Sequence, residues 1–408
     1  MKMTYIFKRT VPGECMITEL TNQSITDLFK LIITELHRES FHNPEKYAVV
    51  NGTPDVKVAV GNIPLTYDLW KGLKNPASVG LYPVGLQEIW EFYAHRRKTA
   101  VDESGRHTIF QVPHSFEHAL ERYKRAVIIS VMLPLSCDII NEYTEVITER
   151  EKGSSYVFAR MSEEVNTLLD KATTRAALHL VRSGNVVIPM DNETVKSISQ
   201  EAIPVTRQGS SHGPSKGGNY PQKSVAALLG LGQFGVHRIV FRDEITDNSV
   251  ERVTGPLRSI IIFDDCDLVT RGKSILYLTE LWRHFLFKLY DFTITDPEIN
   301  KYRFCSYIPA DENGCGICAD YCPSGAQASS IPDTTGRYPE ETTRQKHRFW
   351  EGVLQFDYNR CCEERGQMAS LFPEWSCARG LSMCVSKGIK RKDAVRNFYR
   401  KMEELTRE

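Results

Sequence analysis

The sequence predicts an α+β protein in which a mixed helix and strand core is followed by a small cysteine-rich domain. Apolar runs of strand length alternate with amphipathic stretches of helical period between residues 24 and 289. Eight of the 11 cysteines then fall between Cys305 and Cys384. At 408 residues and 41% hydrophobic content, the chain is long enough for two or three domains and can bury a core.

Charge and hydropathy exclude several classes of protein. The 51 Lys and Arg residues balance 51 Asp and Glu residues, so no overall field directs the chain to nucleic acid or a membrane surface. No apolar run approaches the ~20 residues of a membrane span. The first ten residues lack the apolar stretch of a secretory signal. We therefore expect a cytoplasmic protein without a membrane span, whose clustered cysteines bind metal instead of forming disulfides.

Residues 1–124 are expected to form an α/β cap. Residues 24–39 carry apolar side chains at helical spacing, with Ser24 as the expected N-cap. A second amphipathic stretch runs from 86 to 97, and 57–61 reads as a short strand. Aromatic side chains concentrated here either pack the cap or form a wall for a large planar ligand: Tyr67, Trp70, Tyr82, Trp90, Phe92 and Tyr93.

Residues 125–295 form the expected α/β core. Buried strands are predicted at 126–133, 185–190, 237–242 and 259–263, and helices at 156–180, 222–229 and 274–289. Between them, residues 206–221 are rich in Gly, Ser and Pro and read as a loop.

Gly230-Leu-Gly232-Gln-Phe-Gly235 matches the G-x-G-x-x-G pattern of dinucleotide-binding folds. That pattern requires a strand before it and a helix after it, so that the helix N-terminus meets the pyrophosphate. Here a helix is predicted before and a strand after, so the sequence argues against a nicotinamide site.

The cysteine-rich domain, residues 296–390, carries a ferredoxin-type motif. Cys315-x2-Cys318-x3-Cys322-Pro has the bacterial ferredoxin spacing, and eight thiolates are what two four-iron clusters need. Glu312 stands where the first cysteine usually falls, and Cys305 replaces it. Crossover ligation assigns one cluster to Cys305, Cys315, Cys318 and Cys384, and the other to Cys322, Cys377 and one or both of Cys361 and Cys362.

Alternatives remain open for the second cluster, because neighbouring cysteines rarely aim both side chains at one metal corner. It is either a four-iron cluster, one with a non-cysteine ligand, or a three-iron (3Fe-4S) cluster. A zinc site is the competing reading of Cys315-x2-Cys318, but the wide spacing of Cys377 and Cys384 and the proline after Cys322 favour iron–sulfur. The isolated Cys15, Cys137 and Cys266 read as core thiols.

Three segments resemble corrinoid-dependent reductive dehalogenases and epoxyqueuosine reductases. Cys305…Cys315-Gly-Ile-Cys318-Ala-Asp-Tyr-Cys322-Pro resembles the first cluster motif of the dehalogenases. Residues 222–237 resemble the helix and Gly-Leu-Gly turn that both groups share, and residues 356–361 are similar to the lead-in to the second cluster motif. The likeness covers roughly residues 125–385.

The resemblance implies a nitroreductase-like α/β domain that binds cobalamin beside a two-cluster, ferredoxin-like domain. Electrons would pass through the clusters to form Co(I), which acts on the substrate. Gly230, Gly232, Gly235 and His237 are the cobalamin contacts expected on this basis. Glycines let backbone approach a large ring, and equally allow a tight connection between helix and strand.

The sequence departs from epoxyqueuosine reductases at one chemical point. From Ala202 to Arg242 it contains no Asp or Glu, although those enzymes place a catalytic carboxylate shortly before the Gly-Leu-Gly helix. Reductive bond cleavage needs a proton for the developing carbanion, and Tyr220 is the candidate donor. Lys216 or His212 would lower its pKa or stabilise the departing anion, and Asn219 would orient it. Basic residues here, including Arg242, suit an anionic substrate.

The leading hypothesis is therefore a cobalamin-dependent iron–sulfur reductase that cleaves a carbon–halogen or related bond in a small molecule. A separate low-potential ferredoxin or flavodoxin would supply electrons. Two alternatives remain: a tRNA epoxyqueuosine reductase, with the basic helical tail at 391–408 as an RNA-docking surface, and a non-catalytic electron-transfer or corrinoid-handling protein.

Overall fold

A computed structural model describes residues 20–40, 47–50, 52–65, 86–95, 98–101, 107–110, 112, 115–123, 125–138, 140–141, 156–181, 185–191, 220, 222–234, 239–245 and 250–264. In these residues the protein is mixed α and β, as the sequence predicts. The segment 274–289, the cysteine-rich domain and the basic tail lie outside the described residues.

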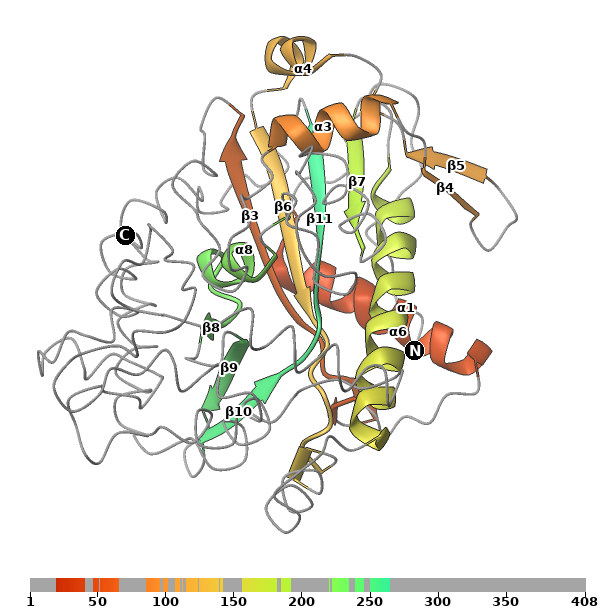
Figure 1. Ribbon diagram of the computed structural model, residues 1–408, viewed down its shortest axis with the longest axis vertical. Helices are drawn as coiled ribbons and strands as arrows, with labels where there is room; N and C mark the ends of the chain where they lie inside the picture. The colour runs from red at the N-terminus through yellow and green to blue at the C-terminus, as the bar shows by residue number, and fades with distance from the viewer. Residues whose placement is uncertain are drawn as a thin grey trace, which may run out of the picture.

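The core of the described structure is a four-stranded sheet with the order β3-β6-β11-β7 (Figure 1). It consists of β3 (Lys57–Pro64), β6 (Arg125–Met132), β11 (Leu257–Asp264) and β7 (Val186–Met190), and each neighbouring pair is antiparallel. The apolar runs predicted at 126–133, 185–190 and 259–263 are confirmed as strands. Such runs are typical of strands that are covered on both faces.

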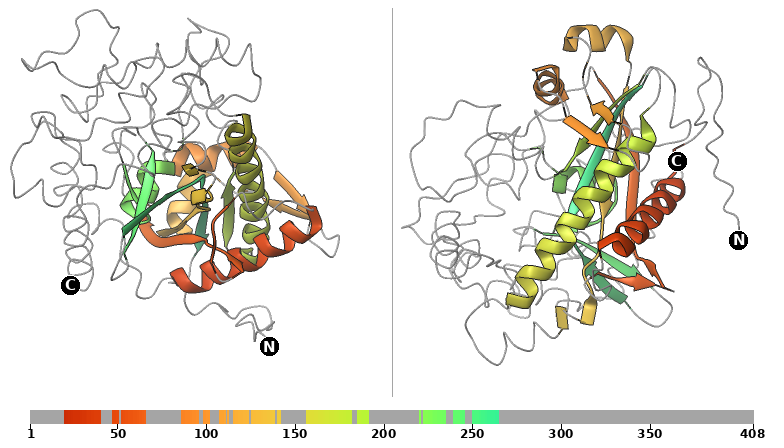
Figure 2. Two further views of the ribbon diagram at one scale, coloured as in Figure 1. Left: turned by 90° about the horizontal axis from the view of Figure 1, so that it is seen from below. Right: turned by 90° about the vertical axis from the view of Figure 1, so that its right-hand side faces the viewer.

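Two long helices cover one face of this sheet. α1 (Asn22–Ser40) packs on α6 (Tyr156–Leu180) and on β3, and α6 packs on β7 and β11 (Figure 2). Both helices were predicted from their apolar periodicity, and α6 has the predicted bounds.

Shorter elements cover the opposite face. α8 (Gln222–Leu228) packs on β6 and β11. α3 (Leu86–His95) brings Trp90 against β11, where its ring centre lies 4.7 Å from that of Phe263. Both helices confirm predicted ones. The sheet is thus the middle of three layers.

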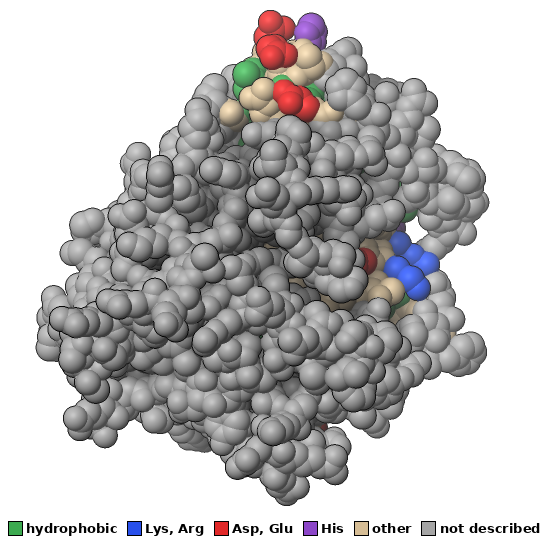
Figure 3. All heavy atoms as spheres, in the orientation of Figure 1, with side chains coloured by type: hydrophobic (Ala, Val, Ile, Leu, Met, Phe, Trp, Pro, Cys, Tyr) green, Lys and Arg blue, Asp and Glu red, His purple; other side chains and the backbone are tan. Residues whose placement is uncertain are grey.

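The remaining elements lie around this core. α4 (Phe116–Arg122) begins after Ser115, whose Oγ accepts a hydrogen bond from the backbone N–H of His118 at 3.5 Å. Acidic side chains and a histidine on the exposed side of α4 are visible at the top of Figure 3. Two small antiparallel pairs complete this group: β1 (Val49–Val50) with β2 (Thr53–Pro54), and β4 (Lys98–Val101) with β5 (His107–Phe110).

A second sheet has the order β10-β9-β8. It is formed by β8 (Gln233–Phe234), β9 (Val240–Ile245) and β10 (Val250–Thr254). The strand predicted at 237–242 thus begins at Val240 and continues to Ile245. Its bounds follow from pairing with β10, where Ile245 lies opposite Val250, and apolar content alone did not reveal that pairing.

The start of α1 corrects the expected N-cap. Thr21 caps the helix, because its Oγ1 accepts from the backbone N–H of Ser24 at 3.1 Å while Ser24 Oγ accepts from the N–H of Thr21 at 3.1 Å. This reciprocal pair is a capping box in which Ser24 takes the position usually held by Glu or Gln. Asn22 Oδ1 also accepts from the N–H of Val60, which ties the helix to the edge strand β3.

The four-stranded sheet contains strands from both sides of the domain boundary that the sequence predicted at residue 124. β3 comes from segment 1–124 and pairs along its whole length with β6 of segment 125–295. Of the aromatic residues considered as a ligand wall, Trp90 and Tyr93 are buried, and Tyr93 donates to the Pro189 carbonyl at 3.3 Å. For these two residues the packing interpretation holds.

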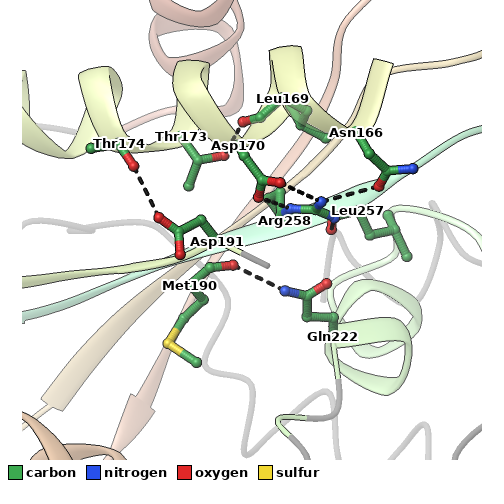
Figure 4. Close-up of polar contacts among 10 residues, drawn as sticks. All are labelled: Asn166, Leu169, Asp170, Thr173, Thr174, Met190, Asp191, Gln222, Leu257 and Arg258. Atoms are coloured by element: carbon green, nitrogen blue, oxygen red, sulfur yellow. Dashed lines mark hydrogen bonds and ion pairs between the residues drawn. The ribbon is translucent and has the colours of Figure 1, made fainter. Parts of the chain in front are cut away.

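A partly buried ion pair joins β11 to α6 (Figure 4). The Arg258 guanidinium contacts both carboxylate oxygens of Asp170, with Nη2 3.0 Å from Oδ2, and donates to Asn166 Oδ1 at 3.0 Å. The Arg258 side chain is 6% exposed and that of Asp170 is 25% exposed.

Among the described residues, no helix is long and apolar enough to cross a bilayer.

Asp170→Asn should destabilise the protein by roughly 3 kcal/mol, because it leaves the Arg258 cation buried without its counter-ion. Urea unfolding of the full-length chain measures the change. Glu244→Gln is the matched control, since its ion pairs with Lys57 and Arg242 are half-exposed and are worth below about 1 kcal/mol. Equal losses for the two variants would show that Arg258 does not depend on Asp170.

Candidate functional site

The start of α8 lies at the end of β7, close to the centre of the sheet. The Gln222 side-chain amide donates to the Met190 carbonyl at 3.0 Å (Figure 4), and the Gln222 backbone N–H donates to the Tyr220 carbonyl at 2.8 Å. These two hydrogen bonds set the position from which Tyr220 approaches the sheet.

Tyr220, the predicted proton donor, is buried with 1% of its surface exposed. Burial raises the pKa of its phenol above the ordinary range, because an apolar environment disfavours the phenolate, and the nearby Ser259 hydroxyl opposes part of that rise. Ser259 Oγ forms no hydrogen bond of ordinary geometry with a described residue, which agrees with its smaller effect. Tyr220 is therefore a neutral phenol at physiological pH.

Two serines lie on the sheet face beneath Tyr220. Ser259 of β11 lies directly opposite Ser130 of β6, so both side chains are on the same face. Both residues are 0% exposed, and neither hydroxyl has a hydrogen-bond partner among the described residues. A buried polar group left without a partner costs about 1–3 kcal/mol, so this pair is an unusual feature for the middle of an apolar sheet.

The opposite face of the same strands is different in character. Ile129 and Ile260, adjacent along the strands to the two serines, are fully buried and apolar. Arg258, one residue before Ser259, points to α6, which fixes the alternation of β11. Asp191, at the end of β7, is buried and accepts a hydrogen bond from Thr174 of α6 at 3.1 Å (Figure 4). Asp191 thus lies on the α6 side, away from Tyr220.

Gly230 terminates α8. The backbone N–H of Leu231 donates to the Ala226 carbonyl at 2.9 Å, the hydrogen bond typical of a Schellman motif, and Gly230 has φ of 77°. A side chain at Gly230 would meet no atom within 4 Å. The backbone here is open to a bulky ligand, but the turn by itself accounts for the glycine.

Gly232 has a packing role. A Cβ at this position would lie 2.6 Å from the Phe241 carbonyl oxygen and 2.7 Å from Val240 Cγ1. The glycine therefore allows the chain leaving α8 to pass directly against β9. Of the two explanations left open for these glycines, a tight connection between helix and strand accounts for the need for glycine at position 232. The expected arrangement, with a helix before the motif and strands after it, is confirmed.

A buried ion pair supports β9 behind this contact. Arg252 of β10 binds Asp243 through two hydrogen bonds of 2.7 and 3.1 Å, and its guanidinium carbon lies 4.0 Å from the centre of the Phe241 ring. Thr254 Oγ1 donates to the Val240 carbonyl at 2.7 Å. These interactions hold the two residues that Gly232 contacts.

Arg242 does not contribute the free positive charge that the sequence suggested. Its Nε lies 2.9 Å from Glu244 Oε1, which is also 3.1 Å from Lys57 Nζ. Lys57 in turn contacts Asp55 at 2.8 Å. The positive charge expected from Arg242 is thus offset by a carboxylate two residues along the same strand.

Most of the other predicted site residues lie outside the described residues, and no position is assigned to them. They are Lys216, His212, Asn219, Gly235, His237 and the eight cysteines Cys305, Cys315, Cys318, Cys322, Cys361, Cys362, Cys377 and Cys384. Within the described part of the chain, no group of three His, Cys, Asp or Glu side chains is placed to hold a metal ion.

Sequence reasoning missed Ser130 and Ser259. A signal was present, since each serine interrupts an apolar strand run at a position that must be buried if both faces of the sheet are covered. What the runs did not reveal is that the two serines face each other and lie beside Tyr220.

No protein-family model matches this chain, and no curated protein is found that matches it.

Gly232→Ala should lower stability by about 2 kcal/mol, because the added methyl overlaps β9 backbone that cannot move without disturbing the sheet. Gly230→Asn should cost below about 1 kcal/mol, because asparagine tolerates the left-handed conformation and the space is open. Thermal unfolding of both variants measures the difference. If Gly230→Asn were the more damaging change, the packing role of Gly232 would be wrong.

Proposed function

We propose that the protein is a cobalamin-dependent iron–sulfur reductase, similar to the reductive dehalogenases, that cleaves a carbon–halogen or related leaving-group bond. The observation that carries the iron–sulfur part of this proposal is the cysteine spacing from Cys305 through Cys315-x2-Cys318-x3-Cys322-Pro. The cobalamin and the reaction are what the resemblance to the reductive dehalogenases implies. Low-potential electrons would come from a separate ferredoxin or flavodoxin.

Cobalamin, when bound, supplies the strongly reducing metal centre that bond cleavage requires. The chain's own contribution at the described site is a proton. Tyr220 stays neutral because burial raises the pKa of its phenol, so its proton is retained until a strong base forms beside it. A carbanion is a far stronger base than a phenolate, and a neutral phenol can protonate it.

The absence of Asp and Glu from the sequence between Ala202 and Arg242 favours this reaction over the tRNA epoxyqueuosine reductase activity. That activity needs a carboxylate near the start of the Gly-Leu-Gly helix. The carboxylate closest in sequence before Tyr220 among the described residues is Asp191, which is directed to Thr174 on the other side of the sheet. At Gly230 an added side chain would meet no atom within 4 Å, so a bulky cofactor could approach the backbone there.

Anaerobic purification with cobalamin, followed by iron, sulfide and cobalt analysis, tests the cofactors. We expect about eight iron atoms per chain for two cubane clusters, together with about one cobalt. About four iron atoms would remove the second four-iron cluster. Colourless protein with zinc as its metal would contradict the proposal altogether.

Tyr220→Phe should abolish turnover of an organohalide while leaving cobalt and iron content unchanged, because only the transferable proton is lost. Tyr123→Phe is the matched control: Tyr123 is also buried, but its ring packs against Trp90 and Phe263, away from α8. Full activity of Tyr220→Phe would exclude Tyr220 as the donor. Cobalamin binding without turnover by the unmodified protein would favour the electron-transfer or corrinoid-handling alternative.

A further inference from the structure

The serine pair beneath Tyr220 is placed so that its two hydroxyls can form hydrogen bonds with each other and with a nearby acceptor. Directly opposite residues of antiparallel strands have Cβ atoms about 4.5–5.5 Å apart, so the hydroxyls of Ser130 and Ser259 can reach each other. A serine hydroxyl donates one hydrogen bond and accepts two, and rotation about χ1 redirects it without moving the strand. Both hydroxyls are therefore available to turn toward a new acceptor.

We propose that Ser259, supported by Ser130, is a positioning residue for Tyr220, donating a hydrogen bond to the phenol oxygen when that oxygen carries negative charge. Ser130 would donate in turn to Ser259 Oγ, which directs the Ser259 proton toward the tyrosine. The only covalent change is the O–H bond of Tyr220: its proton leaves and is later regained from water, while both serines keep theirs.

No charged group on the described sheet face takes this role. Across the four strands, the residues in register with the serine pair are uncharged: Ala59, Ser130, Ser259 and Met190. The next row of residues on the same face is also uncharged: Gly61, Ile128, Ile261 and Ile188. Lys57 lies one row away in the other direction and is bound to Asp55 and Glu244. In α8, Lys223 is half-exposed, and Arg258 points to the opposite face.

The position of Ser259 also affects the pKa of the Tyr220 phenol. Burial and the Ser259 hydroxyl are the two influences on the pKa of the phenol, and they act in opposite directions. A hydrogen bond to a charged oxygen is stronger than one to a neutral oxygen, so the effect of Ser259 grows as the phenolate forms. The use of Tyr220 as an acid rests on the proposed function, whereas the hydrogen bond from Ser259 does not.

Site-specific replacement of Tyr220 by a fluorinated tyrosine, whose phenol ionises more readily, allows titration in the folded full-length protein by fluorine NMR. Ser259→Ala should lower the ionisation constant of this phenol roughly tenfold, which is an upward shift of about one pH unit. Ser130→Ala should shift it in the same direction by less. Ser259→Cys, which keeps the size of the side chain but donates weakly, should fall between Ser259→Ala and the unmodified protein.

Ile261→Val is the matched control, because Ile261 is buried on the same strand and face, one row from the pair, and has no hydroxyl. It should leave the titration unchanged. A shift for Ser259→Ala no larger than that for Ile261→Val would overturn the proposal. Thermal unfolding of Ser259→Ala and Ser130→Ala distinguishes a change in the Tyr220 titration from a loss of folding stability. Removing either unpartnered hydroxyl should not lower the unfolding midpoint.

The result is independent of the cofactor. If the protein proves to lack cobalamin yet Ser259→Ala shifts the titration, the positioning role stands and the proposed reductase function fails. If cobalamin is bound and turnover depends on Tyr220, but the titration does not change, the positioning role fails alone.

Discussion

One continuous stretch of chain from Val250 to Asp264 belongs to both sheets, and the described structure depends on it. β10 pairs with β9, the chain passes Gly255, and β11 then pairs with β6 and β7 (Figure 1). A side chain at Gly255 would collide with the Leu133 backbone, so glycine is required where the chain crosses the end of β6. The Leu133 N–H donates to the Pro256 carbonyl at 3.3 Å, which fixes this crossing.

The alternation of β11 then sets the chemistry on each face of the sheet. Arg258 is directed to α6, where its desolvated charge is compensated by Asp170 and by a hydrogen bond to Asn166. Ser259 is directed to the side of Tyr220 and α8, where the hydroxyls meet no described partner. A one-residue change of register would exchange these environments, because successive side chains point to opposite faces. The register of the central strand therefore decides which face carries the ion pair and which face carries the serine hydroxyls.

Much of the described secondary structure could be predicted from local pattern. Helices at 156–180 and 222–229 and strands at 126–133 and 259–263 were predictable because period and apolar content are properties of neighbouring residues. Predictions were less accurate where one specific hydrogen bond, strand pairing or ion pair decides. Thr21, not Ser24, caps α1 through a mutual contact, β9 extends to Ile245 because β10 pairs there, and Arg242 is neutralised by Glu244, which Lys57 of another strand also contacts.

The sequence by itself determined the cysteine spacing and the glycine-containing turn, because both are patterns within a few residues of chain. It also placed Tyr220 directly before a helix, which made it a candidate. Only the tertiary structure decided what surrounds that tyrosine. Ser130 and Ser259 are 129 positions apart in the chain and meet because β6 and β11 are adjacent and in register. Contacts between distant segments depend on strand order and register, which no local pattern encodes.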